Sequence, residues 1–310
     1  MSQTGNNTPL VSVVVITYNS SATVVETLES IKKQTYPNIE LIVTDDCSKD
    51  DTVRVSQQWI ASNDHRFVRT LIVKSDKNTG VSPNCNRGWK KAEGKWIKFI
   101  AGDDRLLPNC IMDYIDYIQS NKEARIIFSK VVPIGNIEEG KKWPWLDVSL
   151  LFQELSQKQF RILLCRGNFL PAASAIMCKK VLQDLDGYDE SIPLLEDWPF
   201  WMKATNSGYK LSFMNKETTE YRFGDASISQ RTPSKQYIES SIRCAVLGKH
   251  FLRNISLLSR FYFFTMKHAN KNILMRILHC FNILNPFYYE YYNSFKRFEV
   301  VKTEILNNIS

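Results

Sequence analysis

Long apolar runs are missing from this chain of 310 residues. None approaches the ~20 consecutive apolar residues that a membrane-spanning helix needs, although 44% of the residues are apolar, an ordinary share for a globular protein. Residues 1–8 are polar and lack the basic and apolar regions of a signal peptide. We therefore expect a cytoplasmic protein with a large core, built as one large domain or as a domain with an appendage.

Paired cysteine motifs are missing as well. The seven cysteines are odd in number and no two have the CxxC spacing, so a zinc site or a disulfide framework has little support and reduced thiols are expected. No GxGxxG motif follows the first β-branched run of the chain. A dehydrogenase with a dinucleotide-binding loop is therefore not expected.

Acidic residues are scarce in the last part of the chain. Residues 1–230 contain 28 Lys+Arg and 28 Asp+Glu, whereas residues 231–310 contain 12 and 4, so the net charge of +8 lies entirely in the second segment. Its basic and aromatic helical pattern favours binding to an anionic membrane surface. The alternatives are a helical cap on the rest of the chain or a dimer contact. No DNA- or RNA-binding motif is present, so nucleic acid is not expected as a partner.

The N-terminal part of the chain alternates between apolar runs and helical patterns. We predict strands at 11–16, 39–44, 67–73 and 96–102, and helices at 20–34, 52–62 and 82–92. This β-α-β-α-β-α-β order with short connections predicts an α/β fold with an open, mostly parallel sheet flanked by helices.

The pattern is less regular after Pro108. We predict helices at 111–120, 179–185 and 198–207 and strands at 126–132 and 173–178, whereas residues 140–170 are aromatic and poorly periodic. Residues 236–310 are mostly helical in pattern. The predicted division is a catalytic domain at 1–230, with halves at about 9–106 and 107–230, and a basic helical tail at 231–310.

Two of the predicted strands end in adjacent aspartates. Residues 39–44 run into Asp45-Asp46, and residues 96–102 run into Asp103-Asp104. Ligands of open α/β sheets bind outside the carboxyl ends of the parallel strands. Two acidic strand ends predict an oxygen-rich crevice there, suited to a hard divalent cation and to the hydroxyls of a nucleotide.

Several short motifs occur in an order that is typical of one family. They are Val11–Asn19, Asp45–Thr52, Asn78–Gly80, Asn86–Gly88, Ala92–Gly94 and Gly102–Asp104. Taken together they resemble the family-2 glycosyltransferases of the GT-A fold, over residues 9–230. The resemblance implies a GT-A, Rossmann-like fold and the transfer of a sugar, usually from a UDP-sugar, with inversion at the anomeric carbon.

The resemblance also implies roles for the two acidic strand ends. Asp104 would bind a divalent metal, Mn²⁺ or Mg²⁺, which neutralises the charge of the leaving nucleotide diphosphate. Asp103 would contact the ribose or a metal-bound water, and Asp46 would accept a hydrogen bond from the uracil ring. The structural alternatives are an Asp cap for the Asp103-Asp104 pair and a turn-forming role for Asp45.

Other donor residues follow from the same resemblance. Thr17 and Tyr18 would pack against the base, with a plain strand terminator as the alternative for Thr17. Asn78, Gly80 and Arg87 belong to the segment that closes over the nucleotide. Cys85 stands where the family commonly has Arg; Arg87 either supplies the positive charge nearby or lies on a solvated helix face.

The residues expected to act on the acceptor lie in the segment 194–201. By resemblance, Asp197 is the general base that takes the proton of the attacking hydroxyl, with Glu196 beside it. The alternatives are Glu196 as the base, or an acidic first helical turn stabilised by the helix dipole. Trp198 and Trp201 form either an apolar face for the acceptor sugar or part of the core. The segment 187–190 resembles a family turn that would position the acceptor loop, and 168–171 would also line that pocket. Residues 221–222 resemble a further family element, but the histidine that often follows it is absent.

The expected function is the addition of one sugar to a glycan acceptor on polyprenyl diphosphate, in bacterial O-antigen or capsule assembly, at the inner face of the cytoplasmic membrane. A processive polymer synthase is not expected, because the QxxRW motif and membrane helices of such enzymes are missing. The alternative function is a non-catalytic module that binds a nucleotide-sugar.

Overall fold

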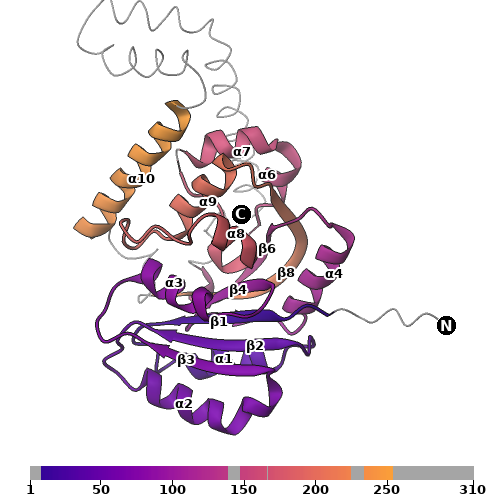
Figure 1. Ribbon diagram of the computed structural model, residues 1–310, viewed down its shortest axis with the longest axis vertical. Coiled ribbons are helices and arrows are strands. Elements are labelled where there is room, and N and C mark those ends of the chain that lie inside the picture. Colours follow the sequence, from indigo (N-terminus) through magenta and orange to yellow (C-terminus); the bar gives the residue numbers. More distant parts are fainter. Residues whose placement is uncertain (1–7, 139–146, 166, 225–233, 254–310) are drawn as a thin grey trace, which may run out of the picture.

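The computed structural model describes residues 8–138, 147–165, 167–224 and 234–253. They form one eight-stranded sheet with helices on both faces, in the strand order β3-β2-β1-β4-β7-β6-β8-β5 (Figure 1). The predicted α/β class with a Rossmann-like, GT-A-type sheet flanked by helices is confirmed.

The N-terminal half of the sheet is parallel. β1 (Val11–Thr17) lies between β2 (Ile39–Asp45) and β4 (Trp96–Ala101), and β3 (Arg69–Lys74) pairs with the outer side of β2. β1 and β2 are almost wholly buried, which explains why most of their residues are β-branched or otherwise apolar. Their buried polar side chains Ser12 and Glu40 hydrogen-bond to each other.

Three helices cover this half. α1 (Val24–Lys32) contacts α2 (Thr52–Asn63), and α3 (Val81–Lys91) packs on β1 and β2 on the other side of the sheet (Figure 1). The close approach of α3 depends on Gly88, because a Cβ atom there would lie 2.4 Å from Cγ1 of Val14. α3 is thereby fixed directly above the ends of β1 and β2.

The other half of the sheet is mixed. β7 (Ile176–Cys178) runs antiparallel to both β4 and β6 (Ile126–Gly135), β8 (Leu211–Phe223) is parallel to β6, and the short β5 (Arg105–Leu106) is antiparallel to β8. The helices of this half are α4 (Cys110–Ser120), α6 (Ser149–Glu154), α7 (Gln157–Leu164), α8 (Lys179–Asp184) and α9 (Asp197–Asn206).

Some predicted elements differ from the observed ones. The first helix begins at Val24, because a turn precedes it in which the Ser20 carbonyl accepts hydrogen bonds from the amides of Thr23 and Val24. The third strand begins at Arg69 after a short 3₁₀ helix at 64–66. α6, α7 and β8 were not predicted; the β6–β8 pairing shifts register near Lys130, and the buried positions of β8 accordingly do not alternate.

The last described element is α10 (Lys235–Arg253), which packs against α9. Within the described residues no helix combines the length and apolar character needed to cross a membrane. Six cysteines are described and all are unpaired, as predicted. Cys280 and the rest of the basic tail, residues 254–310, lie outside the described residues.

Candidate active site

Both acidic strand ends lie at the same edge of the sheet. The register pairs Thr17 of β1 with Asp45 of β2, and Ile16 of β1 with Ala101 of β4. Asp46 and the Asp103-Asp104 pair therefore follow the carboxyl ends of two strands that flank β1. The sequence predicts this edge as the ligand site, since that is where open α/β sheets bind their ligands.

Asp45 is the last residue of β2, and its side chain stabilises the turn that follows. Its buried carboxylate accepts hydrogen bonds from the Thr17 hydroxyl at 2.9 Å, from the Ser48 amide at 2.9 Å and from the Ser48 hydroxyl at 2.5 Å. These contacts are those of a turn-forming residue, and they also bury Thr17. Tyr18, in contrast, is 48% exposed at the same edge, where its ring is open to a flat ligand.

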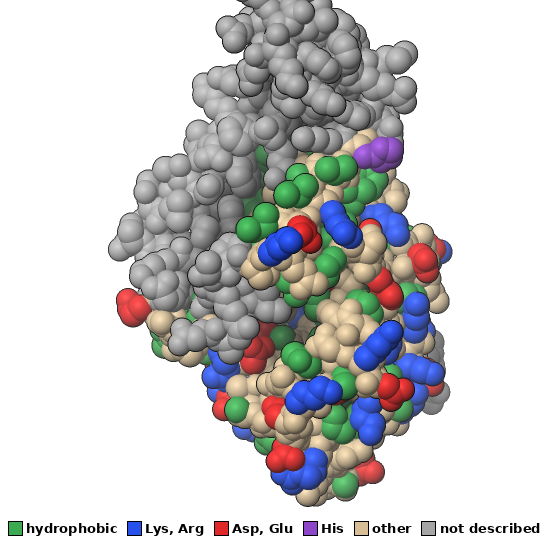
Figure 2. All heavy atoms as spheres, turned by 90° about the vertical axis from the view of Figure 1, so that its left-hand side faces the viewer, with side chains coloured by type: hydrophobic (Ala, Val, Ile, Leu, Met, Phe, Trp, Pro, Cys, Tyr) green, Lys and Arg blue, Asp and Glu red, His purple; other side chains and the backbone are tan. Residues whose placement is uncertain are grey.

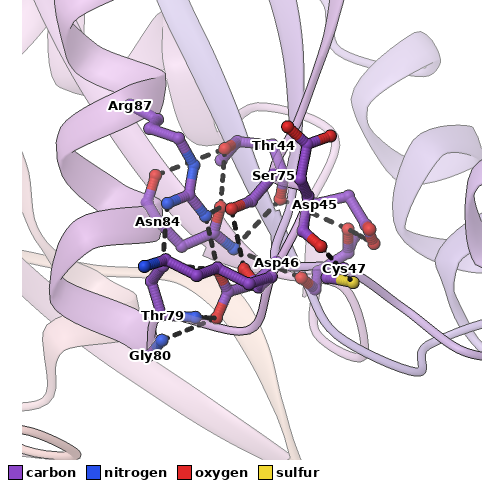
Figure 3. A network of polar contacts seen from close by, with 12 residues as sticks. Thr44, Asp45, Asp46, Cys47, Ser75, Thr79, Gly80, Asn84 and Arg87 are labelled. Carbon is purple, nitrogen blue, oxygen red and sulfur yellow. Dashed lines mark hydrogen bonds and ion pairs between the residues drawn. The ribbon is translucent and has the colours of Figure 1, made fainter.

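Asp46 is surrounded by four hydrogen-bond donors (Figure 3). One carboxylate oxygen accepts from the amides of Thr79 and Gly80, at 2.9 and 2.6 Å; the other accepts from the Thr79 hydroxyl at 2.7 Å and from Arg87 at 2.6 Å. A carboxylate has about four lone-pair positions. A uracil N–H would therefore displace one of the protein's own donors, or Asp46 would act by holding these groups in place.

Arg87 reaches from α3 to this carboxylate. Its guanidinium also donates to the Thr79 hydroxyl at 2.7 Å and to Oδ1 of Asn84 at 3.0 Å. Arg87 thus points into the site and not into solvent. Gly80 has a φ of +95°, a conformation that a residue with a side chain rarely adopts, and directly precedes α3. Asn78, the other predicted residue of this loop, is exposed.

Asp103 and Asp104 are held by Arg222 of β8. The Arg222 amide donates to Oδ1 of Asp104 at 2.8 Å, and its Nε donates to the Asp103 carbonyl at 2.8 Å. The guanidinium then reaches Glu26 of α1 at 2.6 Å. Asp104 is buried, whereas the Asp103 side chain is partly exposed, so Asp103 presents the more open carboxylate of the pair.

Burial raises the pKa of both aspartates. The pKa of Asp104 lies well above its usual range, because burial and the neighbouring Asp103 charge both disfavour the ionised form. The pKa of Asp103 is also raised, chiefly by burial. Two crowded carboxylates with hard oxygen atoms fit a divalent cation, which would remove their repulsion. Within the described residues no cluster of three or more His, Cys, Asp or Glu side chains forms a metal site by itself.

Glu196 and Asp197 lie at the start of α9. Oδ2 of Asp197 accepts from the Asn168 amide group at 2.7 Å, and Oδ1 accepts from the Trp198 amide at 2.7 Å. Burial raises the pKa of both acids, and for Glu196 the Asp197 charge adds to the effect and brings the pKa to about 8. The hydrogen bonds to Asp197 favour its ionised form.

The two tryptophans of this segment belong to the core. Trp198 is buried and donates its indole N–H to the Leu164 carbonyl at 2.6 Å. Trp201 is 1% exposed and packs against Phe128 and Phe200. Of the two alternatives predicted for these residues, core packing is the observed one.

Asn86 links the donor side of α3 to the turn at 187–190, a role that was not predicted. Its amide group donates to the Tyr188 carbonyl at 2.9 Å and to Glu190 at 2.8 Å, and its Oδ1 accepts from the Tyr188 amide at 2.9 Å. Gly187, with a φ of +65°, leaves room for this contact, because a Cβ there would lie 2.4 Å from Oδ1 of Asn86.

α3 thus stands between the two groups of acids. Cys85, next to Asn86, is buried, and its pKa is raised by burial and by the charges of Glu196 and Asp197, whereas Arg87 lowers it. Glu196, Asp197 and Arg87 are therefore all close enough to the Cys85 thiol to influence its pKa. Arg87 and Asn86, adjacent in sequence, respectively hold the loop at 78–80 and the turn at 187–190.

An α/β sheet whose N-terminal half is parallel, with paired acids at the carboxyl ends of two strands that flank β1, has the architecture of the GT-A class. Residues 12–185 match the family described as Glycosyl transferase family 2, and the chain belongs to this family.

Relatives with assigned names include the UDP-Glc:alpha-D-GlcNAc-diphosphoundecaprenol beta-1,3-glucosyltransferase WfaP of Escherichia coli. It is 28% identical over 223 residues, which cover 71% of this chain and 80% of WfaP. The putative teichuronic acid biosynthesis glycosyltransferase TuaG of Bacillus subtilis is 23% identical over 225 residues, or 71% of this chain and 82% of TuaG.

Solved structures share the fold at lower identity. TarS of S. aureus in complex with UDP-GlcNAc has a TM-score of 0.62 at 19% identity, covering 96% of this chain and 92% of the TarS chain. A mannosyltransferase from Pyrobaculum calidifontis in complex with GDP-Man and Mn²⁺ has a TM-score of 0.55 at 13% identity, covering 92% and 86%.

Proposed function

We propose that this glycosyltransferase moves one sugar from a UDP-sugar to a glycan acceptor with inversion at the anomeric carbon. The observation that carries the proposal is the placement of Asp46 and the Asp103-Asp104 pair at one edge of the parallel strands. WfaP is named for a UDP-sugar donor, and TarS was solved with UDP-GlcNAc; both agree with a uridine nucleotide here.

The donor would lie along this edge. Tyr18 offers an exposed ring for the base, with Thr17 beneath it, and the loop from Asn78 to Gly80 closes the other side. Asp46 and Arg87 hold that loop by the contacts described above. The base is then recognised by a pocket that these two charged residues shape.

The Asp103-Asp104 pair would hold Mn²⁺ or Mg²⁺. The resemblance assigns the metal to Asp104, and the structure gives Asp103 the more open side chain, so we propose that the pair acts as a unit. A divalent cation, when bound, stabilises the negative charge of the departing diphosphate. Arg222 fixes the backbone of the pair and one carboxylate oxygen, which keeps both acids in position.

Asp197 would act as the general base. It removes the proton of the acceptor hydroxyl while that oxygen forms its bond to the anomeric carbon, and the bond from this carbon to the diphosphate oxygen breaks on the opposite face. UDP leaves with the bonding electrons. The hydrogen bonds from Asn168 and from the Trp198 amide orient the Asp197 carboxylate, and burial together with the Asp197 charge raises the pKa of the neighbouring Glu196 to about 8.

The acceptor that we propose is a sugar on polyprenyl diphosphate, in O-antigen or capsule assembly. WfaP is named for such a lipid-linked acceptor. The protein would work at the inner face of the cytoplasmic membrane, bound through its tail. Hydrophobic side chains gather along α10 on the face shown in Figure 2, among them Ile238, Ile242 and Val246, each at least half exposed. The net charge of +8 in residues 231–310 complements an anionic membrane surface.

A donor screen tests the function. Nucleotide release is measured for the common UDP- and GDP-sugars with Mn²⁺, first with an N-acetylglucosaminyl diphospholipid as acceptor. We expect release from a UDP-sugar that requires both acceptor and metal. If the nucleotide binds, as seen by thermal shift, but no donor is turned over with any acceptor, the protein is a non-catalytic nucleotide-sugar-binding module.

A further inference from the structure

α10 is fixed against the segment that carries Asp197, although its sequence belongs to the basic tail. It packs along α9 (Figure 1), and Nη1 of Arg243 donates to the Ser191 carbonyl at 2.5 Å. Farther along, a Cβ on Gly248 would lie 2.0 Å from the Cys165 carbonyl oxygen. The backbones of α10 and of the residue following α7 are therefore in direct contact, which only glycine allows.

One face of α10 turns toward Asp197. Tyr237, Ser240 and Cys244 are spaced by three and four residues and so share a face of the helix. Ser240 and Cys244 are completely buried, and Tyr237 is partly buried. The pKa of Cys244 is raised to about 12 by burial and by the charges of Asp197 and Asp189, and the pKa of Tyr237 is raised by burial and by the Asp197 charge.

Two hydroxyl groups on this face have unused hydrogen-bonding capacity. The Ser240 hydroxyl is buried and has no hydrogen-bond partner. The Tyr237 side chain makes no hydrogen bond within the described part of the chain, where only its backbone amide and carbonyl are bonded. Buried polar groups in folded proteins are nearly always paired, so an unpaired hydroxyl near a candidate catalytic acid points to a ligand.

We propose that this face of α10 forms one wall of the acceptor site, where the Tyr237 hydroxyl bonds to a hydroxyl of the acceptor sugar beside the one that Asp197 deprotonates. Ser240 lies one turn farther along the same wall. The proposal rests on the proposed function and adds a substrate-binding residue that lies outside the matched family region at 12–185. A sugar presents several hydroxyls in a ring, which suits an aromatic side chain with a polar end.

The outward face of the same helix provides a matched control. Glu239 is exposed and directly precedes Ser240 in sequence, but it lies on the opposite side of α10. Glu239→Gln should leave the acceptor site unchanged. Tyr237→Phe removes one hydroxyl and keeps the ring, so the packing of α10 is retained, and Ser240→Ala removes the second hydroxyl.

The test is a steady-state analysis of these variants with UDP-glucose and N-acetylglucosaminyl diphospholipid, or with the pair that the donor and acceptor screen selects. We expect Tyr237→Phe to raise the KM for the acceptor roughly three- to tenfold, as expected for one lost hydrogen bond. Its KM for the donor and its melting temperature should match those of the wild type. Ser240→Ala should act in the same direction, and Glu239→Gln should change neither KM.

Two results would overturn the proposal. If the acceptor KM stays within twofold of the wild-type value in both Tyr237→Phe and Tyr237→Ala, the Tyr237 side chain does not contact the acceptor. Equal changes in both KM values together with a lower melting temperature would show that Tyr237 only supports packing. Failure of the proposed function is distinct, because it would appear as an absence of turnover in the wild-type protein itself and would overturn both proposals.

Discussion

Arg87 and Asp46 form an ion pair of 2.6 Å that joins the second turn of α3 to the end of β2. The Asp46 side chain is nearly inaccessible, and the Arg87 side chain is 24% exposed. Because Asp46 also accepts both amides of the Thr79-Gly80 loop, the pair fixes the position of that loop. The proposed base pocket therefore depends on an arginine that replaces the positive charge missing at Cys85.

Arg87→Met should weaken both the fold and the donor site. The variant leaves the buried Asp46 charge without its cation, which should lower the free energy of unfolding by about 2 kcal/mol and loosen the loop at 79–80. Denaturant unfolding and titration with UDP measure the two effects. Arg54→Met is the control, because Arg54 pairs with Asp51 on the exposed surface; equal behaviour of the two variants would contradict the role of Arg87.

Asp104→Asn should abolish metal-dependent nucleotide binding. Removal of one charge from the Asp103-Asp104 pair lowers its affinity for a hard cation. We expect Mn²⁺ to raise the melting temperature of the wild-type protein with UDP and to have little effect on the variant. Asp116→Asn, on the exposed side of α4, is the control. Full turnover of the wild-type enzyme in excess chelator would rule out a metal at this pair.

Asn86→Ala should separate the acceptor turn from α3. It removes the hydrogen bonds to the amide and carbonyl of Tyr188 and leaves both in a buried setting, so we expect a loss of about 2–3 kcal/mol in the free energy of unfolding. In the folded variant the KM for the acceptor should rise more than that for the donor. An unchanged ratio of the two KM values would mean that the turn at 187–190 does not shape the acceptor site.

Glu196→Gln should make stability less dependent on pH. Glu196 has a pKa of about 8 in the folded protein and an ordinary value near 4.3 in the unfolded chain. Between these values the folded state holds a proton that the unfolded state releases, so rising pH favours unfolding. The melting temperature of the wild-type protein should therefore fall from pH 5 to pH 8 more than that of the variant. Glu123→Gln, at an exposed position, should behave as the wild type.

Removal of residues 254–310 should weaken binding to anionic vesicles. This deletion removes 7 Lys+Arg and 3 Asp+Glu and keeps α10 with its contacts to α9. Sedimentation with phosphatidylglycerol vesicles, compared with phosphatidylcholine vesicles, measures the change. Unchanged partitioning would assign the tail to the alternatives predicted from the sequence, a helical cap or a dimer contact.

The sequence predicts the parallel half of the fold well because its central strands, β1 and β2, are buried on both faces. Residues 11–16 and 39–44 are mostly apolar, with Ser12, Glu40 and Thr44 as the polar positions. The register of these strands places their ends at one edge of the sheet. β8 could not be predicted, because its burial pattern depends on an irregular pairing with β6 that no local signal encodes.

The same difference separates the predicted site residues from those that were missed. Asp46, Asp104 and Asp197 stand in recognisable local motifs. Asn86 and Arg222 act through contacts with partners 102 and 119 residues away, and the proposed role of Tyr237 depends on a charge on another helix. Such pairings arise only when the chain has folded. The sequence identified Arg87 as a candidate site residue. It did not show that Asp46 accepts four hydrogen bonds, one of which Arg87 donates.

The central claim is that Asp46, Asp104 and Asp197 surround one sugar-diphosphate site. A crystal structure of the protein with UDP and Mn²⁺ tests it most directly. We predict the uracil beside Tyr18 and the loop at 78–80, the metal between the diphosphate and the Asp103-Asp104 pair, and the Asp197 carboxylate facing the open side of the diphosphate. UDP bound elsewhere, or Mn²⁺ bound away from both aspartates, would contradict the account.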